Sequence, residues 1–174
     1  MSTVLFPGTF DPIHYGHINI ARRAADLFDE VIVAVYARDQ SNILFPPEKR
    51  LALVEESFKT VGNISVTAYT GLTVKFAKNV GANALLRGLR VFSDFEYEFR
   101  MALANNRLDP DIDVIALITS EEHTFLSSTT VREIAALGGD VSSMVPTHVQ
   151  EALEARFQQL GKDQDVVPLT SLRD

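Results

Sequence analysis

The chain has no cysteine among its 174 residues, which excludes disulfide bonds, thiolate catalysis and cysteine-bound metals. No apolar run approaches the roughly 18 residues that a membrane-spanning helix needs. Basic residues are few, because 16 Lys and Arg stand against 23 Asp and Glu and leave a net charge of −7. That balance argues against a general nucleic-acid binder. We therefore expect a soluble cytoplasmic domain, free of nucleic acid and membrane, in which a local arginine cluster holds any bound polyanion.

The composition is otherwise that of an ordinary globular domain. Hydrophobic residues make up 46% of the chain and charged residues 22%, so extensive disorder is not expected. Apolar periodicity continues to about Leu160 and is lost afterwards. We expect residues 1–160 to form a single domain and residues 161–174 to form a flexible C-terminal tail.

Short apolar runs alternate with helical patterns along the chain. The runs are continuous and of strand length, as in strands that are covered on both faces: Val4–Phe6, Val31–Tyr36, Ile64–Val66, Ala84–Leu86 and Val114–Ile118. Helical periodicity lies between and after them, at Ile18–Phe28, Pro46–Phe58, Leu72–Val80, Phe95–Asn106, Val131–Leu137 and Val149–Leu160. This alternation predicts an α/β fold with a doubly wound, mainly parallel five-stranded sheet and helices on both faces.

Ligands of such sheets bind beyond the carboxyl ends of the strands, so we expect binding residues in the segments that follow the strands. After the first strand, Gly8 permits a turn, and His14 and His17 stand three residues apart at the start of a helix. Free amides at a helix start suit a phosphate. The alternative interpretations are two surface imidazoles, or a His-x-x-His metal site that lacks a third ligand nearby.

Arginines follow the fourth predicted strand. Arg87 and Arg90 flank Gly88-Leu89, and guanidinium groups bind phosphate in a planar, bidentate manner. A solvated basic loop is the alternative interpretation. In the helix that follows, the spacing of Phe95, Phe99 and Ala102 predicts a core stripe, and Glu98 alone is more typical of a solvated helix surface.

Hydroxyl groups follow the fifth predicted strand, at Ser127-Ser128-Thr129-Thr130. Thr130 and Glu133 fit a capping box with Thr130 as the N-cap, which leaves the preceding hydroxyls and Arg132 available for a phosphate. Neither the P-loop nor the dinucleotide-binding glycine fingerprint is present. The three segments together predict a phosphate-binding site at one edge of the sheet.

These segments carry a family resemblance over nearly the whole chain, from about Thr3 to Leu160. Gly8-Thr9-Phe10-Asp11-Pro12, the His14–His17 motif and Ser127–Arg132 resemble the HxGH nucleotidyltransferases. Arg87–Arg90 and the acidic helix after them are similar, more narrowly, to the bacterial phosphopantetheine adenylyltransferases. The resemblance implies a Rossmann-like fold and transfer of the adenylyl group of ATP to 4′-phosphopantetheine, the penultimate step of coenzyme A biosynthesis. It also implies Mg²⁺ bound with ATP, a cytoplasmic homohexamer and coenzyme A as a feedback inhibitor.

The same resemblance implies roles for individual residues. His17 falls on the family's transition-state stabiliser. The positions that match phosphopantetheine contacts are Thr9, Ser41, Thr73, Arg87 and Asn105. The positions that match ATP contacts are Thr9, Phe10, His17, Gly88, Leu89, Arg90, Glu98, His123, Thr124, Phe125, Leu126, Ser127, Ser128 and Thr129. No residue of the protein is expected to hold a metal by itself.

Two positions depart from the family pattern. Many members have Lys where this chain has Ser41, which weakens the expected clamp on the acceptor phosphate unless Arg38 replaces it. His123 stands where a larger aromatic residue is common. The competing hypotheses are a different HxGH enzyme, acting on glycerol 3-phosphate or nicotinamide mononucleotide, and a catalytically silent nucleotide sensor.

Overall fold

The computed structural model describes residues 1–37 and 42–162. Ser41, Arg38 and the expected tail beyond Lys162 lie outside the described residues. Within the described part, strands β1 (Thr3–Gly8), β2 (Glu30–Tyr36), β3 (Ile64–Tyr69), β4 (Ala84–Leu89) and β5 (Asp113–Ile118) form one sheet. Every predicted strand is present, and the pairings are all parallel in the order β3-β2-β1-β4-β5.

Helices follow the strands at the places that the periodicity predicts, with ends shifted by a few residues. They are α1 (Tyr15–Ala25), α2 (Pro47–Phe58), α3 (Thr73–Asn79), α4 (Phe92–Leu108), α5 (Ser128–Ala136) and α6 (Thr147–Lys162), with a short 3₁₀ turn, η1 (Glu121–His123). The α/β fold class is confirmed. In the described part of the chain, no helix is long and apolar enough to cross a membrane.

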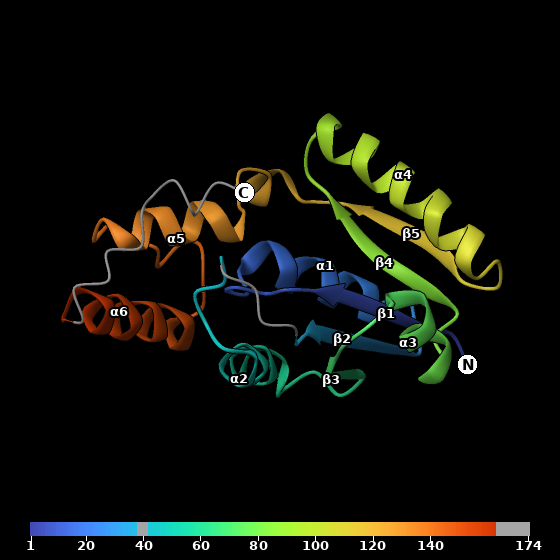
Figure 1. Ribbon diagram of the computed structural model, residues 1–174, viewed down its shortest axis with the longest axis horizontal. Helices are drawn as coiled ribbons and strands as arrows, with labels where there is room; N and C mark the ends of the chain where they lie inside the picture. Colours follow the sequence, from blue (N-terminus) through green and yellow to red (C-terminus); the bar gives the residue numbers. More distant parts are fainter. Residues whose placement is uncertain (38–41, 163–174) are drawn as a thin grey trace.

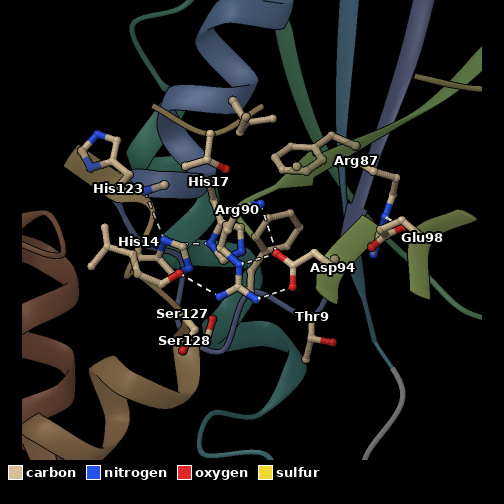
Figure 2. A pocket seen from close by; sticks show the side chains of 18 of the residues that line it. Thr9, His14, His17, Arg87, Arg90, Asp94, Glu98, His123, Ser127 and Ser128 are labelled. Atoms are coloured by element: carbon tan, nitrogen blue, oxygen red, sulfur yellow. Dashed lines mark hydrogen bonds and ion pairs between the residues drawn. The ribbon is translucent and has the colours of Figure 1, made fainter. Parts of the chain in front are cut away.

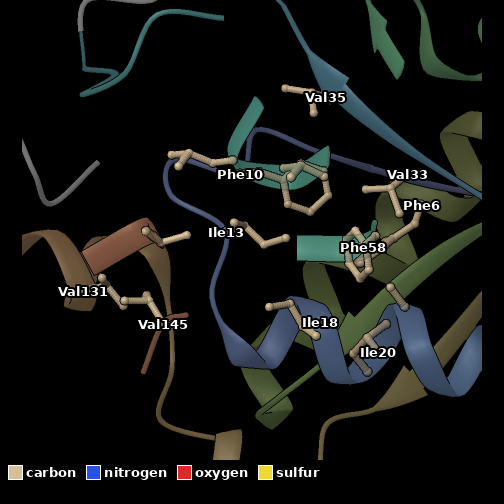
Figure 3. Packing of buried hydrophobic residues seen from close by; sticks show 14 of the residues in the cluster. Phe6, Phe10, Ile13, Ile18, Ile20, Val33, Val35, Phe58, Val131 and Val145 are labelled. Carbon is tan, nitrogen blue, oxygen red and sulfur yellow. The ribbon is translucent and has the colours of Figure 1, made fainter. Parts of the chain in front are cut away.

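The two faces of the sheet bury different amounts of apolar surface. Val4 and Phe6 of β1 point into a large core that α1, α2, α5 and α6 close, and Figure 3 shows Phe10, Ile13 and Phe58 packed within it. Leu5 points into a smaller core beneath α3. This alternation along β1 places helices on both faces of the sheet, as predicted.

Helix α4 differs from the other helices, because none of its residues is buried. Figure 1 shows it lying along β4 and β5, away from α2, α5 and α6. The prediction that Phe95 and Phe99 form a core stripe is wrong, since they are 50% and 52% exposed. Ala102, the third residue of the predicted stripe, is partly buried, and the other partly buried positions of α4 are polar: Asp94, Glu98 and Asn105. A polar helix face therefore lies against the open end of the sheet.

Candidate active site

The order in which the strands follow one another reverses between β1 and β4. Two adjoining cavities open beyond the carboxyl ends of these two strands. The His17 pocket, of about 410 Å³, lies between the starts of α1 and α5. The Thr73 pocket, of about 430 Å³, lies between α3 and α4. Thr9, Arg87 and Glu98 line both pockets and form the boundary between them.

Two histidines build the start of α1. His14 is the N-cap, and its Nδ1 accepts a hydrogen bond of 3.1 Å from the Gly16 amide. His17 Nδ1 accepts a bond of 3.3 Å from the His14 amide, and the two rings stack with their centroids 3.7 Å apart. Because Nδ1 is an acceptor in each ring, a neutral ring carries its proton on Nε2. His17 therefore lines the pocket with its ring orientation and tautomer fixed by the backbone.

Both histidines are held in the neutral form. Burial, with smaller effects of the Arg90 and Arg87 guanidiniums, lowers the pKa of His17 to about 3. Burial also lowers the pKa of His14 well below its usual value, with additional effects of His17, Arg90 and His123. His17 is thus a neutral hydrogen-bond donor at neutral pH in the absence of ligand.

Two glycines are required by close contacts in this region. A Cβ atom on Gly16 would lie 2.9 Å from the His14 ring, and one on Gly8 would lie 2.9 Å from the Phe10 ring. Phe10 itself has a φ of 50°, in the left-handed region. The bend that brings Thr9 and Phe10 over the pocket therefore depends on the absence of a side chain at Gly8.

Two buried charged side chains, Asp11 and Arg50, stabilise this bend by hydrogen bonds. The Asp11 carboxylate accepts hydrogen bonds of 2.7 and 3.0 Å from the Leu44 and Phe45 amides. Arg50 donates to the Thr9 carbonyl at 2.8 Å and to the Phe45 carbonyl at 3.0 Å. These contacts connect the loop after β1 to the segment before α2 and to α2 itself. They fix the position of the Thr9 backbone.

Each predicted arginine pairs with a carboxylate of α4. Arg87 donates to both oxygens of Glu98, at 2.8 and 2.6 Å. Arg90 donates to both oxygens of Asp94, at 3.0 and 3.2 Å, and to the Leu126 carbonyl at 3.0 Å. Figure 2 shows the Arg90 guanidinium between Asp94 and the histidines of α1. Burial raises the pKa of Asp94, but the hydrogen bonds from Arg90 outweigh it and the pKa lies below its ordinary value.

The start of α5 differs from the prediction. The N-cap is Ser127, whose Oγ accepts a bond of 3.0 Å from the Thr130 amide, so the choice of Thr130 as cap was wrong by three residues. Ser128 Oγ donates to the Pro12 carbonyl at 2.9 Å. Arg132 is buried and donates to the Asp11 carbonyl, so it supports the loop after β1 and is not part of the pocket wall. Ser127 and Ser128, at the start of α5, line the His17 pocket.

Most of the predicted site residues line the two pockets. In the His17 pocket they are Thr9, Phe10, His17, Arg87, Gly88, Arg90, Glu98, His123, Leu126, Ser127 and Ser128. In the Thr73 pocket they are Thr9, Thr73, Arg87, Glu98 and Asn105. Four predicted ATP contacts line neither pocket, although each adjoins a lining residue in the chain: Leu89, Thr124, Phe125 and Thr129. Ser41 lies outside the described residues.

Sequence reasoning assigned no site role to Asp94, which lines the His17 pocket and pairs with Arg90. The signal was available, because Asp94 follows Arg90 by four residues at the start of a helix. His14 was noticed as a neighbour of His17, but its capping role requires the backbone geometry.

The chain is similar in sequence to known proteins. The cytidylyltransferase-like family matches residues 5–134. A phosphopantetheine adenylyltransferase of Methylacidiphilum infernorum is 49% identical over 93% of each chain. The phosphopantetheine adenylyltransferase of Thermomicrobium roseum is 45% identical, over 91% of this chain and 97% of its own.

Solved structures share the fold at low sequence identity. A bifunctional NMN adenylyltransferase/ADP ribose pyrophosphatase of Francisella tularensis, complexed with AMP and a manganese ion, has a TM-score of 0.65 at 15% identity. The match covers 94% of this chain and 53% of that one. A Vibrio parahaemolyticus structure that bears the name of a nicotinate-nucleotide adenylyltransferase has a TM-score of 0.68 at 20% identity, over 91% of this chain and 97% of its own.

Proposed function

The chain belongs to the cytidylyltransferase-like family and, within it, to the phosphopantetheine adenylyltransferases, and from this premise we propose how its two pockets divide the reaction. ATP occupies the His17 pocket and 4′-phosphopantetheine occupies the Thr73 pocket. Adenylyl transfer gives dephospho-coenzyme A and pyrophosphate. The observation that carries the proposal is the boundary between the pockets, where Thr9 and Arg87 reach both cavities.

The chemistry requires no general base. A phosphate oxygen of the acceptor attacks the α-phosphorus of ATP, and the bond from that phosphorus to the bridging oxygen of the β-phosphate breaks. The acceptor phosphate is already largely ionised at neutral pH, since the second pKa of a phosphate monoester is about 6. The enzyme must therefore position the reactants in line and stabilise the charge that develops.

The residues of the His17 pocket supply that stabilisation. The neutral His17 ring offers its Nε2 proton to the α-phosphate, where negative charge accumulates in the transition state. Arg90 and the start of α5, with Ser127 and Ser128, bind the β- and γ-phosphates, which leave as pyrophosphate. Phe10, Gly88, Glu98 and His123 are placed to contact the nucleoside.

The Thr73 pocket holds the acceptor. Thr9 and Arg87 orient its phosphate toward the shared boundary, and Thr73 and Asn105 bind the pantetheine arm deeper in the cavity. Apolar side chains such as Leu72 and Met101 line the remaining wall, in keeping with the aliphatic character of the arm.

A divalent metal ion, which we propose to be Mg²⁺, accompanies the triphosphate. In the part of the chain that the structure describes, no three acidic or histidine side chains gather in a metal-binding cluster. The two carboxylates that line the His17 pocket, Asp94 and Glu98, are already paired with arginines. The ion is therefore bound chiefly by phosphate oxygens, and it supplies neutralising charge for the leaving pyrophosphate.

The exposed face of α4 supports self-association. Phe92 is 88% exposed, and it stacks on Phe95, which stacks on Phe99. An apolar stripe of this kind is typical of an interface, so we propose that α4 packs against another copy in a cytoplasmic homohexamer. Coenzyme A, which contains both substrate moieties, would inhibit by occupying the two pockets together.

The test is turnover with alternative acceptors. The purified chain is incubated with ATP, Mg²⁺ and phosphopantetheine, and pyrophosphate release and dephospho-coenzyme A are measured. Parallel reactions contain nicotinamide mononucleotide with ATP, or glycerol 3-phosphate with CTP. We expect product only with phosphopantetheine; turnover with another acceptor instead would reassign the Thr73 pocket. Binding of ATP without turnover of any acceptor would identify a silent nucleotide sensor.

A further inference from the structure

Asp94 makes an unusual set of contacts at the junction of β4 and α4. Its Oδ2 accepts hydrogen bonds from both the Arg90 backbone amide, at 3.1 Å, and Arg90 Nε, at 3.0 Å. Its Oδ1 accepts from Arg90 Nη2 at 3.2 Å. One carboxylate thus fixes the main chain and the guanidinium of the same arginine.

The remaining terminal nitrogen of Arg90 is also occupied. Nη1 donates to the Leu126 carbonyl at 3.0 Å, one residue before the Ser127 cap of α5. The guanidinium is therefore held between α4 and the segment that leads into α5. A free arginine on a loop samples many rotamers, and binding a phosphate would cost much of that freedom. Asp94 and Leu126 restrict these rotamers before any ligand arrives.

Charge makes Asp94 a poor ligand for the nucleotide phosphates themselves. A carboxylate that lies in a pocket for a triphosphate repels it unless the carboxylate is neutralised by a cation. Asp94 is paired with Arg90 in a bidentate arrangement, which is the strongest geometry for this kind of contact. Its value to a phosphate-binding pocket lies in what it does to Arg90.

We propose that Asp94 is a positioning residue for Arg90: it presets the guanidinium against the start of α5, and so prepares the binding site for the triphosphate. The inference rests on the proposed function, because it places the β- and γ-phosphates beside Arg90. Asp94 acts through the arginine and makes no contact with the substrate. Removing its charge should therefore weaken the use of ATP and leave the use of the acceptor intact.

The experiment is a double-mutant cycle in the full-length enzyme. Asp94→Asn keeps the size of the side chain and an oxygen for the Arg90 amide, but loses the charge and the second acceptor. We expect kcat/KM for ATP to fall about tenfold, on the scale of lost hydrogen bonds to a charged group, with the KM for phosphopantetheine within about twofold. Asp94→Glu should recover part of the loss. In an Arg90→Ala background, Asp94→Asn should have no further effect.

A matched control comes from the same helix. Glu96→Gln removes the carboxylate of an exposed ion pair with Arg100, whose charged atoms are 3.9 Å apart, and should change neither KM. Thermal midpoints of all variants, with and without pyrophosphate, give a readout independent of turnover. Pyrophosphate should stabilise Asp94→Asn less than the unmodified chain.

Three results would overturn the inference. Asp94→Asn could impair the Arg90→Ala enzyme as strongly as the unmodified one, which would show a separate contact or a general structural role. It could tighten ATP binding, which would make Asp94 a competitor of the phosphates. It could also leave kcat/KM for ATP unchanged. Failure of the proposed function is distinguishable, because the unmodified chain would then form no dephospho-coenzyme A.

Discussion

The two pockets meet at Thr9 and Arg87 but differ in the side chains that line the rest of their walls. The His17 pocket is lined by polar groups fixed by hydrogen bonds, such as His17 on the His14 amide and Arg90 on Asp94. The Thr73 pocket shares Arg87 and Glu98 and adds Thr73 and Asn105, and its own wall contains more aliphatic side chains, such as Leu72 and Met101. The His17 pocket therefore has more charged and hydrogen-bonding side chains of its own, and the Thr73 pocket has more apolar ones.

This difference indicates where binding energy serves catalysis. Charged groups that do not reorganise during the reaction stabilise the transition state more than the ground state. In the proposed arrangement, contacts of the Thr73 pocket with the pantetheine arm lie away from the reacting phosphorus, so they would bind the acceptor equally in both states and set its affinity. Substitutions in the His17 pocket should therefore lower kcat, and substitutions in the Thr73 pocket should raise the KM of the acceptor.

Removal of the metal ion should have the largest effect on turnover, and it should impair the use of ATP in the His17 pocket without impairing acceptor binding in the Thr73 pocket. Excess chelator should abolish turnover, because the triphosphate loses the cation that neutralises it. Phosphopantetheine should still raise the thermal midpoint in chelator, since arginine and apolar contacts hold it. Added Mg²⁺ serves as the control and should restore turnover. Undiminished activity in chelator would refute the proposed metal requirement.

His17→Ala should lower kcat by about 10²–10³, or roughly 3–4 kcal/mol, the scale for the loss of one transition-state donor. ATP affinity should change little, because the arginine and the start of α5 still bind the phosphates. Steady-state kinetics and calorimetry of ATP binding measure the two quantities. Near-normal turnover would remove His17 from the mechanism.

Arg87→Ala tests the boundary between the pockets. The KM for phosphopantetheine should rise about 10- to 100-fold, as expected for loss of hydrogen bonds to a charged phosphate at roughly 1.5–3 kcal/mol. The KM for ATP should change less. Lys78→Ala, which removes an exposed cation paired with Asp109, controls for the change in net charge. An equal rise in both KM values would place Arg87 in the nucleotide site instead.

The sequence predicted the centre of the sheet well because β1 and β2 are buried on both faces, whereas the edge strands β3 and β5 are partly exposed. Continuous runs such as Val31–Tyr36 have no interpretation as a surface strand, and the helices between them impose parallel pairing. Helix α4 was harder. Its periodicity predicts a buried stripe of Phe95, Phe99 and Ala102, and this is wrong for both phenylalanines. Periodicity groups apolar residues on one face of a helix but does not say whether that face meets the sheet or the outside.

The site was predictable where residue type determines chemistry. Gly8, His17, Arg87 and Arg90 stood out because few side chains can serve at such positions. The cap of α5 was not predictable, because Ser127 and Thr130 suit the role equally and the distant Pro12 contact of Ser128 fixes the helix start. The pairing of Arg87 with Glu98, eleven residues apart, also depends on how α4 lies over β4, which no local pattern reveals.

The smallest predicted effect is a loss of stability in acid, and it is expected to arise from the His17 pocket and not from the Thr73 pocket. His14 and His17 line the His17 pocket, whereas no residue that lines the Thr73 pocket, within the described part of the chain, is a histidine. His17 has a pKa of about 3 in the folded chain, against an unfolded value of 6.5. Between these values the unfolded chain binds more protons, so the free energy of unfolding rises with pH and falls on acidification.

His17 alone should reduce the free energy of unfolding at pH 5 by about 2 kcal/mol relative to neutral pH, which corresponds to a thermal midpoint lower by roughly 5 °C. His17→Asn keeps an acceptor for the His14 amide without a titrating ring. Its midpoint should therefore decline less between pH 7.5 and pH 5 than that of the unmodified chain. His148→Gln, at a histidine between α2 and α6, controls for the loss of an imidazole elsewhere. If the thermal midpoints of His17→Asn and the unmodified chain decline in parallel with pH, His17 accepts a proton in the folded state. Its proposed role as a neutral hydrogen-bond donor would then be wrong.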